Sequence, residues 1–348
     1  MKLGLMADTH IGVRKFRTKE GMMNLIEWLN NRSFYEAMDI LDKNADRTII
    51  AGDVFENPNP TITSLINFND AIKNKRLSVI SGNHDYSAIS DYNGYHVFDV
   101  LNESGETLSS IDNGITDFKK YYKEVGFEVY DDLTITYLPY KLMNEDSFKL
   151  MFENLNKRNI LIMHGRVDYY GEENEPEYDL PRSIAEHYEL VVAGHVHLPS
   201  VAKLKGGKVL TPGSLTPSSQ ANSKTQRPSV WIYDTETKDL ERIELENPPR
   251  IYELAVEDGK INEALEEGSL YKNKYNLVFI QYNGKLSDIN QAIYQKAFSN
   301  TILLSFKTIE VVEKEVKEVK DFWSFIKEFH PDYEQEFRKV ILDGNGHQ

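Results

Sequence analysis

Side chains that could bind metal ions follow five apolar stretches of this sequence. Residues 47–53 form an apolar run that stops on Gly52 and Asp53. A run of this kind predicts a buried strand that delivers a carboxylate to the carboxyl edge of a sheet. Four other runs, each ending on residues of the same kind, are residues 3–7, 77–80, 160–163 and 190–193. The residues that follow them are Asp8, His10, Asn83, His84, His164, His195 and His197.

These residue types favour a pair of hard or borderline metal ions. A single histidine at a strand end is more often structural than a ligand, but five of the nine histidines lie in this position. Oxygen and imidazole ligands without sulfur suit Mn²⁺, Mg²⁺, iron or Zn²⁺. Two ions about 3.5–4 Å apart would clamp a phosphate and ionise a bridging water at neutral pH. We therefore predict two-metal phosphoester hydrolysis, with Asp53 as the bridging carboxylate.

Two further residues are candidates for proton transfer. The leaving oxygen needs a proton, and His84, between Asn83 and Asp85, is the candidate general acid. Glu56 follows Asp53 by three residues, and its carboxylate could bond to His84 and favour the imidazolium form. The alternative is that Glu56 is a loop residue that faces solvent.

Composition limits the classes of protein to which the chain can belong. The absence of cysteine excludes disulfides and thiolate metal sites and fits a reducing cytoplasm, where we expect the protein. No apolar run approaches the roughly 20 residues of a membrane helix, and no signal segment opens the sequence. The net charge of −15 argues against holding nucleic acid by bulk charge alone. Nucleic acid remains possible as a substrate if local basic patches or a basic partner supply the attraction.

Helical and strand patterns place these runs in an α/β fold. Apolar residues at helical spacing predict a helix over residues 33–44, with Ser33 as its cap, between the first strand and the strand before Asp53. Residues 14–24 are basic and predict a loop, either solvated or in contact with a phosphate backbone. The other predicted helices are residues 61–74, 86–103 and 144–157. The other predicted strands are residues 127–130, 133–140, 207–214, 231–233 and 240–245.

Three parts of the chain differ in composition. Pro248 and Pro249 would interrupt both an α-helix and the hydrogen-bond ladder of a β-sheet. We therefore predict that a catalytic domain over residues 1–247 ends before them. Residues 248–310 alternate short strands, at residues 275–282 and 301–309, with short helices, which predicts a small α+β domain. Residues 311–348 predict charged helices with apolar faces. These faces pack either on residues 250–310 or on a partner protein.

The five motifs, in order, resemble those of the calcineurin-like metallophosphoesterases over about residues 1–235. Within that superfamily the chain most resembles SbcD-type nucleases, subunits of complexes that repair DNA double-strand breaks. The narrower features are Thr9, Ile11 and Gly12 beside the first motif, Val54 and Phe55 after Asp53, and residues 211–214. The resemblance implies a four-layer α/β sandwich of two mixed sheets flanked by helices, with a small capping domain and a helical tail.

The resemblance also implies how the site is divided between two Mn²⁺ ions, although Mg²⁺ or another divalent metal is possible. The first ion would take Asp8, His10, Asp53 and His197. The second would take Asp53, Asn83, His164 and His195. His84 would be the catalytic histidine. Some relatives carry a histidine at the position of Glu56, and related phosphatases carry an aspartate paired to the catalytic histidine, so Glu56 could orient His84.

The implied function is a Mn²⁺-dependent DNA exonuclease and endonuclease that processes double-stranded ends and single-stranded or hairpin DNA in recombination, repair and replication. The implied partner is an SbcC-type coiled-coil ABC ATPase that binds residues 311–348. Residues 60–103 would form a homodimer face, or their aromatic side chains pack on the domain's own core. The alternatives are a phosphodiesterase or phosphatase acting on a small molecule or a protein, and a non-catalytic DNA-end scaffold.

Overall fold

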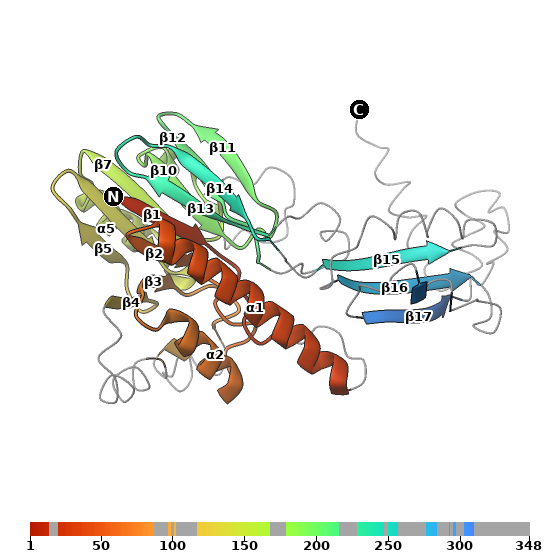
Figure 1. Cartoon of the computed structure of the whole chain (residues 1–348). Coiled ribbons are helices and arrows are strands. Elements are labelled where there is room, and N and C mark those ends of the chain that lie inside the picture. The colour runs from red at the N-terminus through yellow and green to blue at the C-terminus, as the bar shows by residue number, and fades with distance from the viewer. Residues whose placement is uncertain are drawn as a thin grey trace, which may run out of the picture.

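Two mixed β-sheets packed face to face form the main body of the protein (Figure 1). The computed structural model describes residues 1–13, 20–86, 97–98, 101, 117–167, 179–215, 228–246, 250–256, 276–283, 292, 295–296 and 303–309. Within these residues each of the two sheets has six strands, and helices cover the outer face of each. The predicted four-layer α/β sandwich is confirmed.

The first sheet has the order β14-β13-β1-β2-β3-β4. Its strands are β1 (Lys2–Met6), β2 (Arg47–Ala51), β3 (Arg76–Ile80), β4 (Asp117–Tyr121), β13 (Ser229–Asp234) and β14 (Leu240–Glu244). Strands β1 to β4 are parallel, and the β13–β14 hairpin adds to β1 in antiparallel direction. The carboxyl ends of β1, β2 and β3 therefore meet at one edge, as the sequence predicts.

The second sheet has the order β11-β12-β10-β7-β6-β5. Its strands are β5 (Gly126–Val129), β6 (Leu133–Leu138), β7 (Arg158–His164), β10 (Leu190–Gly194), β11 (Ser200–Leu204) and β12 (Gly207–Thr211). The four central strands are parallel, and the edge strands β5 and β11 are antiparallel to their neighbours. A short parallel pair, β8 (Arg166–Val167) with β9 (Asp179–Leu180), follows β7.

Three layers of buried apolar side chains hold the sandwich together. The middle layer joins the sheets, for example through Leu5 and Ile49 from the first and Ile162 and Val192 from the second. The first sheet packs outward on α1 (Glu20–Asn44) and α2 (Ile62–Ile72). The second sheet packs outward on α5 (Glu145–Glu153) and α6 (Arg182–Ala185). Strands buried on both faces explain why their sequences read as continuous apolar runs.

Helix α1 is longer than its sequence pattern predicts. It begins at Glu20, so the predicted loop is wrong for residues 20–24, and residues 14–19 lie outside the described residues. Ser33 lies inside the helix and is 1% exposed, so it is not the cap. Neither glycine nor proline interrupts residues 22–44, and the helix continues through the serine. The capping preference of serine is a local signal, which tertiary packing overrides here.

The predicted helices at residues 61–74 and 144–157 are confirmed as α2 and α5. Thr61 caps α2 by accepting a hydrogen bond from the Ser64 N–H at 3.1 Å, and Asn144 caps α5 by accepting from the Ser147 N–H at 3.0 Å. In the predicted helix at 86–103, residues 97–98 and 101 are helical and the others after residue 86 lie outside the described residues.

All the predicted strands are confirmed, whereas the edge strands β4 and β11 were not predicted. An edge strand such as β11, whose first four residues are exposed, carries little apolar pattern.

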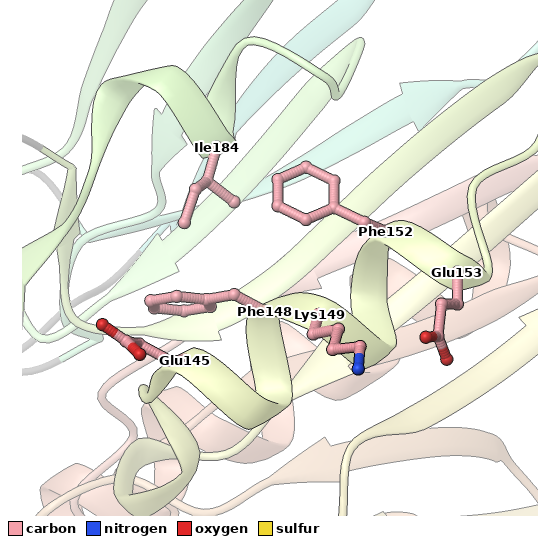
Figure 2. A pocket seen from close by; sticks show the side chains of 6 residues that line it. All are labelled: Glu145, Phe148, Lys149, Phe152, Glu153 and Ile184. Carbon is pink, nitrogen blue, oxygen red and sulfur yellow. The ribbon is translucent and has the colours of Figure 1, made fainter.

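An open apolar groove lies between α5 and α6 (Figure 2). Phe148, Phe152 and Ile184 line it, and its volume is about 490 Å³. Its described lining includes no histidine, so this groove is not where the metal-binding residue types gather.

Residues after 250 form a separate three-stranded parallel sheet. Its strands are β15 (Arg250–Val256), β16 (Asn276–Asn283) and β17 (Leu303–Ile309). The strands predicted near residues 275–282 and 301–309 are confirmed. The proposed boundary at residues 247–249 and the tail at 311–348 lie outside the described residues, so the division into three parts stays a prediction. In the described part of the chain, no helix is long and apolar enough to cross a membrane.

Glu128 anchors a buried polar cluster between the sheets. Its carboxylate accepts hydrogen bonds from Tyr137 at 2.8 Å and Ser78 at 3.0 Å. It also pairs with Lys119 at 3.1 Å and Arg47 at 3.6 Å. Burial alone would raise the pKa of Glu128, but the hydrogen bond from Tyr137 and the charges of Arg47 and Lys119 outweigh it, so the pKa is lowered from 4.5.

We expect Glu128→Gln to reduce the free energy of unfolding by about 3–5 kcal/mol at pH 7, because it removes the negative charge that faces the buried Arg47. The pKa of Glu128 is lowered in the folded state, so its stabilisation is complete above pH 4.5 and is lost as pH falls through the lowered value. Urea unfolding curves of the two proteins should therefore converge as the pH falls below 4.5. The exposed Glu241→Gln is the control, and a constant difference at all pH values would contradict the role given to Glu128.

Candidate two-metal active site

The carboxyl ends of β1, β2 and β3 in the first sheet and of β7 and β10 in the second meet at one place. The structure brings all seven predicted ligands together there. Metal-ligating atoms lie within 4.8 Å of one another in three overlapping groups. The groups are Asp8 with His10 and His197, His10 with Asp53 and His84, and Asp8 with Asp53 and His164.

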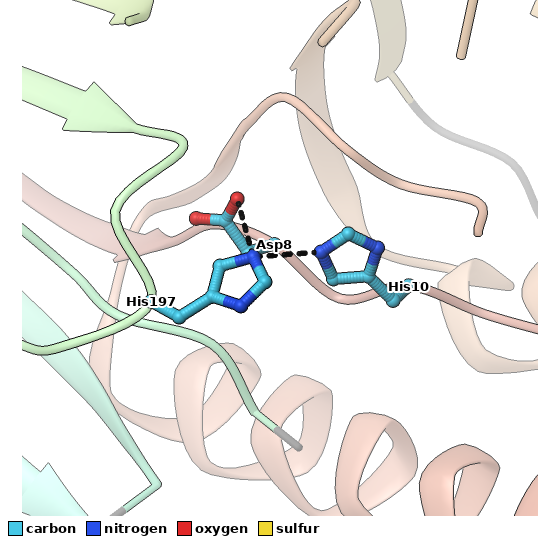
Figure 3. A group of neighbouring side chains, drawn as sticks. All are labelled: Asp8, His10 and His197. Atoms are coloured by element: carbon cyan, nitrogen blue, oxygen red, sulfur yellow. Dashed lines mark hydrogen bonds and ion pairs between the residues drawn. The ribbon is translucent and has the colours of Figure 1, made fainter. Parts of the chain in front are cut away.

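The first set of ligands comes from the loop after β1 and the loop after β10 (Figure 3). His10 Nε2 lies 3.1 Å from His197 Nε2, and His197 Nε2 lies 3.7 Å from Asp8 Oδ1. Figure 3 shows the two imidazoles and the carboxylate pointing toward one another. Two ring nitrogens and a carboxylate that converge in this way suit one cation.

The second set is built around Asn83, in the loop after β3. Asn83 Oδ1 lies 3.0 Å from His164 Nε2 and 3.2 Å from His195 Nδ1. The other ring nitrogen of His164 lies 2.9 Å from the Ala51 carbonyl oxygen. A carbonyl can only accept, so Nδ1 of His164 donates its proton there, and Nε2 is the nitrogen that faces the candidate metal position.

Asp53 lies between the two sets. Its Oδ2 is 3.4 Å from His164 Nε2 and 3.9 Å from His10 Nε2. Its Oδ1 accepts a hydrogen bond of 2.8 Å from the His84 N–H, which fixes the orientation of the carboxylate. Asp53 therefore faces a histidine of each set with one oxygen, the position that a bridging ligand must take.

Buried charge at this point favours cation binding. Burial, assisted by the charge of Asp53, raises the pKa of Asp8 to about 6. Burial also acts to raise the pKa of Asp53, but the charge and the hydrogen bond of His164 outweigh it and hold the pKa well below its usual range. Burial acts to lower the pKa of His164, but the Asp53 and Asp8 carboxylates raise it to about 9. Close carboxylates in a dry site need positive charge, which divalent ions can supply.

The donor chemistry of these residues fits two divalent ions. Carboxylate oxygens, an amide oxygen and imidazole nitrogens form the set, and no sulfur takes part. Glycines leave the space that the set needs, because a Cβ at Gly52 or Gly194 would overlap the His164 ring and one at Gly82 would overlap the Asp53 carboxylate.

The backbone at the ligands is held in an uncommon conformation. Asp8, His10, Asp53 and His195 have φ angles of 52°, 43°, 49° and 91°. A residue with a Cβ in the left-handed region costs of order 1–3 kcal/mol and persists only where surrounding contacts fix it. Here the Asp8 carboxylate accepts from the His195 N–H at 3.0 Å, which links the first sheet to the second. This backbone conformation therefore lowers the stability of the fold, and it directs these side chains toward one place.

His84 lies beside the metal ligands, with its ring centroid 4.8 Å from that of His10. Its Nδ1 bonds to the backbone carbonyl oxygen of Glu56 at 2.8 Å. The carbonyl accepts the Nδ1 proton, so Nε2 is the nitrogen that can exchange a proton with a substrate. This arrangement suits the general acid predicted from the sequence.

Glu56 does not make the contact that the sequence suggests. Its carboxylate was predicted to bond to His84, but Oε2 lies 2.9 Å from His10 Nδ1, and the group that bonds to His84 is the backbone carbonyl of Glu56. The side chain is 16% exposed, so the solvent-facing alternative does not hold either. Burial acts to lower the pKa of His10, but the adjacent Glu56 carboxylate and the nearby aspartates raise it. We infer that Glu56 orients a metal ligand instead of the catalytic histidine.

We expect Glu56→Gln to weaken metal binding about 10- to 100-fold, the usual effect of losing a carboxylate behind a histidine ligand. Activity at saturating metal should change much less. Titration of activity with Mn²⁺ separates the two effects, and Glu153→Gln on α5 is the matched control. A fall in activity at saturating metal with unchanged metal affinity would instead indicate that Glu56 orients His84, as the sequence suggests.

Three residues that position the site were not predicted. Asp85 is buried and accepts hydrogen bonds from the N–H groups of Gly82, Phe55 and Val54 at 2.9, 3.0 and 3.3 Å. It thereby ties the loop after β2 to the loop after β3. Burial, with the charge of Asp53, raises the pKa of Asp85 to about 7. The signal was present, because Asp85 follows Asn83 and His84 directly, but its role was not apparent.

The other two residues hold the loop after β1. Asn30 of α1 donates to the His10 carbonyl oxygen at 2.6 Å, and Ser214 donates to the Asp8 carbonyl oxygen at 2.9 Å. Asn30 lies in the part of α1 that the sequence pattern did not predict as helix. Ser214 lies in the predicted turn after β12, where nothing in its local sequence indicates a contact with Asp8.

Comparison with known proteins agrees with this geometry. Residues 1–238 match the calcineurin-like phosphoesterase superfamily domain. Among solved structures, an archaeal phosphodiesterase shares 18% identity over 70% of this chain and 100% of its own, with a TM-score of 0.36. The phosphopantetheinyl hydrolase of Mycobacterium tuberculosis shares 12% identity over 71% of this chain and 96% of its own, with a TM-score of 0.39. No curated protein matches the chain. The family match covers more than half of the sequence, and the chain therefore belongs to the calcineurin-like phosphoesterase superfamily of metal-dependent phosphoester hydrolases.

Proposed function

We propose that this chain is a Mn²⁺-dependent DNA nuclease, the SbcD-type subunit of a complex that processes DNA ends. The observation that supports it most is how the narrower motif residues contact one another. Thr9 donates to the Val54 carbonyl oxygen at 2.8 Å, and Ile11 pairs with Phe55. These residues are the ones in which the chain resembles SbcD-type nucleases beyond the shared metal ligands, and they support the loops that carry Asp8 and Asp53.

Different residues of the site are proposed to have different roles in phosphodiester hydrolysis. When bound, two divalent ions polarise the phosphate and ionise the attacking water at neutral pH. Asp8, His10 and His197 would hold one ion, Asn83, His164 and His195 the other, and Asp53 would contact both. His84, with Nδ1 held on the Glu56 carbonyl, donates a proton from Nε2 to the leaving oxygen. Mn²⁺ suits a set that combines carboxylate and amide oxygens with imidazoles.

The proposal includes two protein partners. Helix α2 exposes Ile62 by 77% and Ile66 by 54%, one turn apart, which suits a homodimer face. Residues 311–348, with their predicted apolar helix faces, are proposed to bind the SbcC-type ATPase. That partner would supply part of the DNA affinity that a chain of net charge −15 does not provide.

A cleavage assay tests the proposal. The purified chain with Mn²⁺ should shorten linear duplex DNA and open hairpin DNA, and Asp53→Ala should do neither. A chain that cuts no DNA, alone or with the ATPase, while it hydrolyses bis(p-nitrophenyl) phosphate, would be a phosphodiesterase for another substrate.

The alternative, a phosphodiesterase or phosphatase for a small molecule or protein, is favoured by the acidic net charge. Deletion of residues 311–348 discriminates, because a small substrate does not require a partner-binding tail. Loss of DNA processing with retained hydrolysis of bis(p-nitrophenyl) phosphate supports the nuclease. Hydrolysis of that ester by the full-length and the shortened chain alike, with no DNA processing by either, supports the alternative.

A further inference from the structure

A row of aromatic rings and a lysine extends from the second set of metal ligands. The Tyr140 ring lies 6.3 Å from the His164 ring and nearly perpendicular to it, at 79°. The Tyr86 ring lies 6.0 Å from that of Tyr140, and Lys141 Nζ lies 4.7 Å from the centroid of the Tyr86 ring. The row therefore starts at a metal ligand and ends on a positive charge.

Backbone contacts fix this row relative to the catalytic loop. Tyr86 follows His84 by two residues in the loop after β3. The Tyr140 N–H donates to the Ser81 carbonyl oxygen at 3.2 Å, in the same loop. The Tyr86 hydroxyl donates to the Tyr122 carbonyl oxygen at 2.6 Å. Both rings of the row are partly exposed, so they are placed rigidly but still reach the surface.

Positive charge gathers around these tyrosines although the chain is acidic. Lys123 Nζ lies 5.0 Å and Lys120 Nζ 5.8 Å from the centroid of the Tyr122 ring, and Lys141 covers Tyr86. Three lysines therefore lie beside Tyr86 and Tyr122 in a chain whose net charge is −15. Aromatic rings interleaved with cations are the composition of surfaces that bind single-stranded nucleic acid, because bases stack on the rings and phosphates pair with the cations.

We propose that Tyr140, Tyr86 and Lys141 form a nucleotide subsite that stacks the unpaired base adjoining the bound phosphodiester and pairs with the next phosphate. The inference rests on the proposed nuclease function and deepens it by naming the form of the substrate at the site. A base inside a duplex has both faces covered by its neighbours, so it must leave the stack before it can contact these rings. The strand that enters the site is therefore single-stranded over at least this nucleotide.

Two chromogenic esters test the subsite directly. The p-nitrophenyl ester of thymidine 5′-monophosphate and methyl p-nitrophenyl phosphate share the leaving group, and only the first carries a base. With Mn²⁺, the wild type should show a higher kcat/KM for the thymidine ester. Tyr86→Leu should reduce the ratio of the two kcat/KM values about 5- to 100-fold, the range that base stacking on an aromatic ring supports. Tyr86→Phe should restore the ratio, because it keeps the ring and loses only the hydroxyl.

Tyr130→Leu is the matched control. Tyr130 is a partly exposed tyrosine beyond the amino end of β6, whereas Tyr140 follows the carboxyl end of that strand. Tyr130→Leu should leave the rates for both esters unchanged. General damage from Tyr86→Leu, such as loss of metal, would lower both rates together and leave the ratio intact, which would overturn the subsite.

Lys141→Gln provides a second variant, at an exposed position. Its affinity for single-stranded oligonucleotide should depend less on salt, with the slope of log K against log salt reduced by about 0.7 for one lost phosphate contact. Lys149→Gln, beside the groove on α5, should keep the wild-type slope. An unchanged slope in Lys141→Gln would overturn the phosphate contact.

These outcomes separate the subsite from the nuclease proposal. A wild type that cuts no DNA but keeps the Tyr86-dependent preference supports the subsite and overturns only the nuclease. A wild type that cuts DNA without this preference overturns the subsite alone.

Discussion

Asp53→Asn is expected to lower kcat/KM for phosphodiester hydrolysis about a thousandfold or more. One oxygen of Asp53 lies 3.4 Å from His164 Nε2 and 3.9 Å from His10 Nε2, so the carboxylate faces both ligand sets. Divalent ions stabilise the transition state by several kcal/mol, and each 1.36 kcal/mol corresponds to a tenfold change in rate. An amide in place of the carboxylate removes the negative charge that both ions share. Hydrolysis of the thymidine p-nitrophenyl ester at several Mn²⁺ concentrations measures the effect.

The matched control is Asp39→Asn, which removes an exposed carboxylate paired to Lys75 at 2.9 Å. It should keep full activity. Recovery of Asp53→Asn by excess Mn²⁺ to within tenfold of the wild type would show that Asp53 only assists binding of one ion.

His84→Gln is expected to keep its metal ions and to lose about 10²- to 10⁴-fold in cleavage, the usual contribution of a positioned general acid. The loss should be larger for DNA than for a p-nitrophenyl ester, because an alkoxide leaving group needs a proton and p-nitrophenolate leaves without one. Comparing the two substrates with one variant therefore tests proton donation itself. Metal analysis of the same protein preparation completes the measurement.

The alternative for His84 is that it binds a metal. Its ring can join Asp53 and His10 in one group of possible ligands. A variant that loses metal and activity in parallel, with equal effects on both substrates, would make His84 a ligand. The bond between its Nδ1 and the Glu56 carbonyl leaves Nε2 facing the site and is compatible with either role, so metal content and the two substrates decide between them.

The strands and the position of the site were accessible from sequence because both are local signals. A strand buried on both faces must be a continuous apolar run, and the run before Asp53 is 0% exposed at Ile49, Ile50 and Ala51. Parallel strands bring their carboxyl ends to one edge of a sheet. The polar residues that follow these strands are therefore predicted to lie close together. That reasoning places His164 beside Asp53 although 111 residues separate them.

The finer contacts were not accessible, because they depend on backbone conformations that local sequence does not specify. The left-handed backbone of His10 and Asp53 sets where the loop after β2 carries Glu56, and its carboxylate meets His10 instead of His84. Asn30 reaches His10 only because α1 extends beyond its predicted start. Each contact joins elements that are distant in sequence. No fixed separation along the sequence predicts either contact.

Metal stoichiometry tests the bridging role of Asp53 most directly. Calorimetric titration of the metal-free wild type with Mn²⁺ should give two ions per chain. Asn83→Ala, which removes a ligand of the second set only, should keep one tight ion. Asp53→Ala should bind neither ion tightly, because its carboxylate belongs to both sets. One tight ion retained by Asp53→Ala would contradict the bridging role of Asp53.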